Sequence, residues 1–94
     1  MRKLSSLFLL GLLLLPACAP AALPHDGQVI SWDRAVELLN SGAVTQVFQA
    51  HSLEVTLTLT NGAQVTTTEP NIDEIFREIE KCGAKCAGIV QATE

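Results

Sequence analysis

The sequence has few basic residues. Beyond Cys18, four lysine and arginine side chains stand against ten carboxylates, which gives this part of the chain a net charge of about −6 at neutral pH. A nucleic-acid partner needs a basic face, and a polybasic contact with a membrane needs one too. The composition therefore favours neither kind of contact. The four basic residues are Arg34, Arg77, Lys81 and Lys85.

Groups that can carry catalysis are also scarce. The two histidines, His25 and His51, are too few and too far apart in the sequence to indicate a metal site. A serine nucleophile needs a base and an orienting group that converge on it. Ser31, Ser41 and Ser52 stand instead where helix caps and turns are expected. We therefore expect no enzymatic activity, no cofactor and no metal ion.

The first residues have the features of an export signal. Arg2 and Lys3 form a short basic start, and an apolar run follows from Leu7 to Leu15. The run leads into the stretch LPAC, whose last residue is Cys18, and this stretch resembles the lipobox of bacterial lipoproteins. The resemblance implies that residues 1–17 are a signal peptide and that Cys18 is acylated and becomes the mature N-terminus.

The lipoprotein resemblance also implies a location in the bacterial cell envelope. With Ala19 rather than Asp after the cysteine, lipoprotein sorting favours the outer membrane, with the protein lipid-anchored and facing the periplasm. Two alternatives stay open. Cleavage by ordinary signal peptidase after Ala21 gives a soluble periplasmic protein. An uncleaved N-terminal helix would approach the ~20 apolar residues that span a bilayer.

The rest of the chain is predicted to form a tether and one domain. Residues 18–27 are rich in alanine and proline, which is typical of a linker. Residues 28–94 are enough for one domain with a modest core. A domain of this size benefits from a covalent crosslink.

A strand and a helix are expected at the start of the domain. Gln28–Ser31 is the predicted strand, and Ser31 or Asp33 can cap a helix that runs to about Asn40. Apolar residues spaced at i, i+3, i+4 and i+7 give this helix one apolar face. Core packing is therefore the leading interpretation of Trp32, and an exposed aromatic anchor for a partner is the alternative.

A β-hairpin is predicted in the middle of the domain. Residues 44–50 are suited to a strand, and residues 53–60 alternate between apolar and polar side chains, as a strand with one buried face must. Asn61-Gly62 signals the turn. A three-residue loop that ends in Gly62 places Leu57 opposite Val65 and keeps the apolar residues on one face, whereas a two-residue loop mixes the faces. We therefore predict the three-residue loop.

Threonines line the polar face of this predicted hairpin. A dense threonine face is typical of solvated sheet. It also suits a partner that rests on the face or adds a strand to the adjoining edge. Together with the tryptophan of the first helix, these threonines form a candidate partner surface, which consists of Trp32, Thr56, Thr58, Thr66 and Thr68.

A second helix is predicted after Pro70. Asn71 and Glu74 have the spacing of a helix cap, and Gly83 is a natural stop. Cys86–Val90 is expected to return as a last short strand. The expected fold is therefore α+β, a small mixed sheet with two helices in the order β-α-β-β-β-α-β. The apolar stripe of the second helix consists of Ile72, Ile75, Phe76 and Ile79.

Four stretches of the domain follow one known pattern. They are ISWDRAV, SGAVTQV, VTLTLTNGAQVTTTEP and NIDEIFREIEKCGA. The pattern resembles the extracytoplasmic domain of FtsH-type membrane proteases, and it covers essentially the whole predicted domain. Trp32 stands where that family has Tyr, and Ala35 where it has Phe.

The sequence contains neither of the two catalytic motifs of that family. These are the Gly-x-x-x-x-Gly-Lys-Ser/Thr phosphate loop and the His-Glu-x-x-His zinc helix. The resemblance therefore implies a membrane-anchored protein-binding or adaptor module without ATPase or protease parts. Its expected partner is an FtsH-type protease or one of that protease's substrates. A domain kept for envelope structure, with no dedicated partner, is a further interpretation.

Cys82 and Cys86 are the most chemically suggestive pair in the chain. Exported proteins meet an oxidising environment, and residues i and i+4 of a helix have α-carbons about 6 Å apart, within disulfide range. A structural disulfide is the leading interpretation, with Gly83 supplying local unwinding, and two free thiols are another. The alternative function is a periplasmic thiol-redox or copper-handling protein, in which His51 could complete a copper site with the two thiols.

Overall fold

The structure is a computed structural model that describes residues 22–94. The predicted signal peptide, Cys18 and the first residues of the predicted tether lie outside the described residues. Along the described chain, the elements are α2 (Trp32–Asn40), β1 (Val44–Gln49), β2 (Glu54–Leu59), β3 (Gln64–Thr68), α3 (Glu74–Cys82), the 3₁₀ helix η2 (Gly83–Cys86) and β4 (Val90–Thr93).

The strands form one mixed sheet in the order β3-β2-β1-β4. The pairs β1–β2 and β2–β3 are antiparallel, whereas β1 and β4 are parallel. After β3 the chain crosses through α3 and η2 to the opposite edge of the sheet, which allows β4 to run in the same direction as β1. The predicted α+β class, with two helices and a small mixed sheet, is confirmed.

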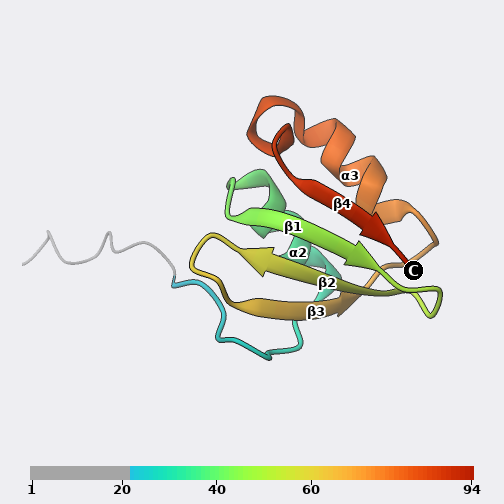
Figure 1. Cartoon of the computed structure of the whole chain (residues 1–94), viewed down its shortest axis with the longest axis horizontal. Coiled ribbons are helices and arrows are strands. Elements are labelled where there is room, and N and C mark those ends of the chain that lie inside the picture. Colours follow the sequence, from blue (N-terminus) through green and yellow to red (C-terminus); the bar gives the residue numbers. More distant parts are fainter. Residues whose placement is uncertain (1–21) are drawn as a thin grey trace, which may run out of the picture.

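The two helices and one face of the sheet enclose a single core. In Figure 1 the strands lie in front of α2, and α3 runs beside β4. Leu38 and Leu39 of α2 and Ile75 of α3 are buried in the same cluster as Val47 and Leu57 of the sheet. Burying a side chain of this size contributes about 1.5–3 kcal/mol. The other face of the sheet is not covered by any element of the described chain.

The start of α2 agrees with the sequence prediction. Ser31 has an extended backbone, and its Oγ accepts a hydrogen bond from the backbone N–H of Arg34 at 3.1 Å. This contact satisfies one of the free N–H groups in the first turn of the helix. Trp32 follows the cap, and its half-buried side chain packs against the core.

The hairpin has the predicted three-residue loop. Leu57 pairs with Val65, and Val55 pairs with Thr67. The backbone N–H of Leu59 donates to the carbonyl oxygen of Ala63 at 2.8 Å, and Gly62 has a φ of 87°. A positive φ is the backbone conformation that glycine adopts at no steric cost. The register prediction is therefore confirmed.

The first and the last strand predicted along the sequence differ from the structure. Gln28–Ser31 does not form a strand, because only Val29 makes an isolated parallel bridge, with Thr66 of β3. The prediction of a strand over Cys86–Val90 was also wrong. Cys86 lies in η2, and strand pairing begins at Val90. The apolar pattern of 86–90 reflects packing against the core, since Cys86 and Ile89 are both buried.

The cap of α3 differs from the prediction based on Asn71 and Glu74. The helix begins at Glu74, after Asp73, whose φ is 69° and whose side chain makes no capping bond. The carboxylate of Glu69 takes that role, because its Oε1 accepts from the backbone N–H of Ile75 at 3.0 Å. Ile72 lies before the helix and is 46% exposed, so it is not part of the buried stripe.

Candidate functional site

The uncovered face of the sheet carries two rows of side chains that follow from the strand register. One row runs across the sheet from Thr66 through Thr56 and Phe48 to Ala92. The parallel row contains Gln64, Thr58, Gln46 and Val90. We call these eight residues the open face. None of them is charged, so a partner that covers them need not desolvate a charge.

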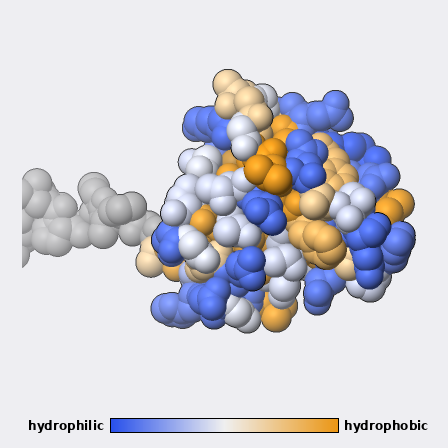
Figure 2. Space-filling view, in the orientation of Figure 1, coloured by the Kyte–Doolittle hydropathy of each residue, from blue (hydrophilic) through white to orange (hydrophobic). Residues whose placement is uncertain are grey.

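Phe48 is the large aromatic group of the open face. Phe48 is 37% exposed and Val90 is 59% exposed. The three threonines of the open face, in β2 and β3, are half-buried. In Figure 2, which has the orientation of Figure 1, hydrophobic groups lie among neutral and hydrophilic ones on the strand side. Contiguous exposed apolar groups mark protein contact sites, and Phe48 and Val90 are diagonal neighbours on the adjacent strands β1 and β4.

Phe48 was not among the residues predicted for the partner surface. A register irregularity between Val44 and Gln46 inserts an extra residue into β1. As a result, Val47 and Gln49 face the core, whereas strict alternation from Val44 would have buried Phe48. A bulge of this kind has no sequence signal in β1, because the β-branched and apolar residues of the strand fit either face.

The predicted partner surface divides between two sides of the molecule. Thr56, Thr58, Thr66 and Thr68 lie on the uncovered side of the β2–β3 hairpin. Trp32 lies in α2, on the side of the sheet that the helices cover, and packs against the core. The structure therefore brings the threonines together with Phe48 and does not bring them together with Trp32.

The two edges of the sheet are not equivalent. The edge of β3 is covered by the segment that precedes α2, because Ile30 donates its backbone N–H to Thr66 and Thr66 donates its own to Gln28, at 2.8 and 3.0 Å. Gly27 also donates to the carbonyl oxygen of Gln64 at 2.7 Å. No strand of the described chain pairs with the outer edge of β4.

A buried polar cluster lies at the C-terminal end of β1. Glu69 is 1% exposed, and its Oε2 accepts from the amide Nε2 of Gln49 at 2.7 Å. The same amide lies 3.3 Å from Oδ1 of Asp73. The Gln49 amide and the backbone N–H of Ile75 at the N-terminus of α3 donate to the buried carboxylate of Glu69 and compensate its charge. The cluster therefore has a structural explanation, which is to hold α3 against the sheet.

A small hollow of about 200 Å³ opens beside this cluster. Its lining consists of Gln49, His51, Ile72, Asp73, Thr93 and Glu94. The backbone N–H of His51 donates to Oε1 of Glu94 at 2.8 Å, and the imidazole and this carboxylate are both largely exposed.

On the surface of α3, the hydrogen bond to Glu74 raises the pKa of Arg77 above its usual value.

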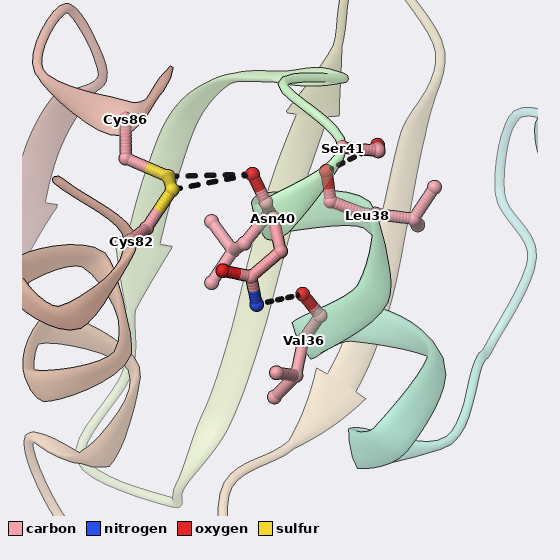
Figure 3. Close-up of a disulfide and its surroundings, with 7 residues drawn as sticks. Val36, Leu38, Asn40, Ser41, Cys82 and Cys86 are labelled. Carbon is pink, nitrogen blue, oxygen red and sulfur yellow. Dashed lines mark hydrogen bonds between the residues drawn. A yellow bond between two sulfur atoms is a disulfide. The ribbon is translucent and has the colours of Figure 1, made fainter. Parts of the chain in front are cut away.

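Cys82 and Cys86 form a disulfide with an S–S distance of 2.01 Å and a Cα–Cα distance of 5.7 Å. It joins the last residue of α3 to the last residue of η2, and Gly83 between the two helices has a φ of 72°. Both sulfurs approach the carbonyl oxygen of Leu39, at 3.6 and 3.3 Å, as the dashed lines in Figure 3 show. Because sulfur in a disulfide carries no hydrogen, these are close S···O contacts.

The surroundings of this disulfide oppose a reactive thiolate. The Leu39 carbonyl belongs to the last turn of α2, and Cys82 ends α3, so the sulfurs lie at the C-terminal ends of two helices. Both helix dipoles disfavour negative charge there. His51 does not lie beside the pair. It lines the hollow before the start of α3, whereas Cys82 is the last residue of this helix, which is about 13 Å long.

Two further observations concern the described part of the chain only. Among residues 22–94, no cluster of three or more His, Cys, Asp and Glu side chains could hold a metal ion. In the same range, neither helix has the length and apolar character needed to cross a bilayer.

Comparison with known proteins does not identify a family. No protein-family model matches the chain, and no match is found among curated proteins.

Proposed function

We propose that this protein is an envelope-located, membrane-anchored module that binds another protein through the open face of its sheet. The proposal assigns it no catalysis and no cofactor. The anchor is the acylated Cys18 that the lipobox-like stretch predicts, and the domain faces the periplasm. The partner is an FtsH-type protease or one of its substrates, as the motif resemblance implies.

The observation that carries the proposal is the uncovered, uncharged face around Phe48. A sheet of this size with helices on one side can leave its other side to water, and such a solvated face is typically polar. Here it carries a partly exposed phenylalanine. Phe48 has Thr56 on one side and Ala92 on the other. Threonine and alanine lose little side-chain entropy when covered. Protein interfaces are depleted in charged residues at their centre and enriched in aromatic ones.

The test is copurification from crosslinked membranes of the cells that produce the protein. Tagged wild-type protein is expected to enrich specific partners over an unrelated lipoprotein. Phe48→Lys, which places a charge in the middle of the open face, is expected to reduce that enrichment roughly tenfold. Ala84→Lys is the matched control, because Ala84 is exposed in η2, on the helix side of the molecule.

Two results would contradict the proposal. One is the absence of any protein enriched over the unrelated lipoprotein. The other is equal recovery of partners with Phe48→Lys and with Ala84→Lys, which would place binding outside the open face. Enrichment of proteins other than an FtsH-type protease or its substrates would keep the binding role and refute the family link.

A further inference from the structure

We infer that two copies of this protein associate along β4, antiparallel about a two-fold axis at Ala92, so that their sheets join into one of eight strands. This inference does not depend on the proposed function. It rests on the backbone of β4, on the side chains beside it and on the charges at its two ends.

The backbone of β4 offers a free hydrogen-bonding edge. The N–H of Glu94 donates to the carbonyl oxygen of Gln49 in β1 at 3.0 Å. Because backbone groups alternate along a strand, Val90 and Ala92 also direct their N–H and C=O groups toward β1. Gln91 and Thr93 direct theirs outward. In an antiparallel pair, two such residues exchange two hydrogen bonds with the residue opposite.

A two-fold axis at Ala92 uses all of these outward groups. It places Gln91 opposite Thr93 of the second copy, and Thr93 opposite Gln91, which gives four N–H···O=C bonds. Ala92 then faces Ala92 of the second copy as a non-hydrogen-bonded pair, with α-carbons about 4.5 Å apart. Alanine is small enough for that approach, and no residue of β4 carries a charge that would meet its own copy.

The open face continues across this junction. Within one copy, Phe48 lies beside Ala92 in the same row. The joined sheet would therefore carry Phe48, Ala92, and the same two residues of the second copy as one uninterrupted apolar row. Cross-strand apolar contacts of this kind contribute to pairing beyond the backbone bonds.

The charges near β4 favour the antiparallel arrangement. Lys85 precedes β4 in η2, and it makes no ion pair among the described residues. Glu94 and Asp73 lie together at the other end of the strand, around the hollow. The two-fold axis brings the Lys85 end of each copy toward the Glu94 end of the other. This complementarity opposes the repulsion between two acidic chains.

The assembly does not extend beyond two copies, because the other edge of the sheet, at β3, is occupied. The segment 27–30 already bonds to β3. The association is therefore closed and isologous, which is the commonest arrangement of homodimers. Four-residue strands bury little surface, so the dimer is weak and its population depends on concentration.

Cysteine crosslinking of the purified full-length chain in detergent tests this geometry. Ala92→Cys places two thiols across the axis at a distance that a disulfide can bridge. Mild oxidation is expected to yield at least roughly tenfold more covalent dimer than wild type or Thr66→Cys. Thr66 is on the same face but lies in β3, with two strands between it and β4, and the wild-type chain measures any background from Cys18.

A second pair of variants fixes the register and does not depend on how Ala92→Cys folds. Gln91→Cys and Thr93→Cys are each expected to give little dimer alone and a covalent dimer when the two proteins are mixed. Lys85→Glu is expected to lower this yield, and adding Glu94→Lys to restore it. Equal crosslinking at 92 and 66, or no dimer from the mixed pair in folded protein, would overturn the inference.

Discussion

Glu69 is the residue whose position most needs a physical explanation. A fully buried carboxylate is costly unless donors surround it, and here the N–H of Ile75 and the amide of Gln49 supply them. The side chain therefore works as a distant helix cap that reaches α3 from the loop after β3. It couples the sheet to the helix through two hydrogen bonds.

Removing this carboxylate is expected to destabilise the domain strongly. Glu69→Ala leaves the N–H of Ile75 and the amide of Gln49 without their acceptor, and we expect the free energy of unfolding to fall by about 3 kcal/mol. Urea unfolding followed by circular dichroism measures the change. Glu80→Ala is the control, because Glu80 is exposed on the same helix. Equal losses in the two variants would show that Glu69 does not cap α3.

The sequence could not reveal this cap. The spacing of Asn71 and Glu74 is a local pattern, and local patterns are what a single sequence displays. Glu69 reaches the N–H of Ile75 across a turn in which Asp73 has a φ of 69°. Such a conformation is uncommon in residues other than glycine, although aspartate is among those enriched in it. An aspartate at this position equally suits a helix cap, so its residue type does not indicate the turn.

Among the elements, the hairpin was the most predictable. Its apolar residues alternate without interruption, so only one loop length keeps them on one face, and that loop needs a positive φ at its last residue. Gly62 meets the requirement with a φ of 87°. The pattern and the turn therefore determine the register together.

The turn supplies a prediction at the scale of this element. Gly62→Ala is expected to lower the free energy of unfolding by about 1–2 kcal/mol, since a Cβ strains a backbone with positive φ. A Cβ on Gly62 or on Gly88 would meet no atom within 4 Å, and only Gly62 has a positive φ. Gly88→Ala is therefore the matched control. If thermal or urea unfolding shows equal losses in the two variants, the positive φ of Gly62 does not strain the alanine variant.

The elements that were mispredicted depend on non-local contacts. Residues 86–90 are apolar enough for a strand, yet their apolar side chains serve the core and η2, and the pairing with β1 starts where the chain reaches that edge. The position of Phe48 on the open face depends likewise on an irregularity in β1. Tertiary packing decides both, and strand propensity carries little information about it.

At the scale of the whole molecule, the disulfide closes the helix layer of a small domain. It ties α3 to η2 and touches the end of α2 through the Leu39 carbonyl. It lies on the helix side of the sheet, away from the open face. Stability and partner binding should therefore respond separately to its loss.

Replacing both Cys82 and Cys86 by serine is expected to lower the free energy of unfolding by about 2 kcal/mol, the loss of chain entropy expected for a short loop. Partner recovery in the copurification assay should stay unchanged, because Phe48 and its neighbours are untouched. Chemical unfolding and copurification of the same variant measure the two quantities. Loss of binding in a variant that stays folded would assign the pair a direct role in recognition.

The segment before α2 has a mechanical consequence for an anchored protein. If the chain is anchored as proposed, tension acts first on Ala22, whose carbonyl oxygen accepts a hydrogen bond from Arg34 at 3.3 Å. It acts next on the hydrogen bonds from Gly27 and Ile30 to β3. Under tension these hydrogen bonds would break one after another, starting from the N-terminal end. Residues 22–30 can therefore peel away and lengthen the attachment by about 30 Å before tension reaches the core. The segment before α2 can therefore detach under tension while the core of the domain stays folded.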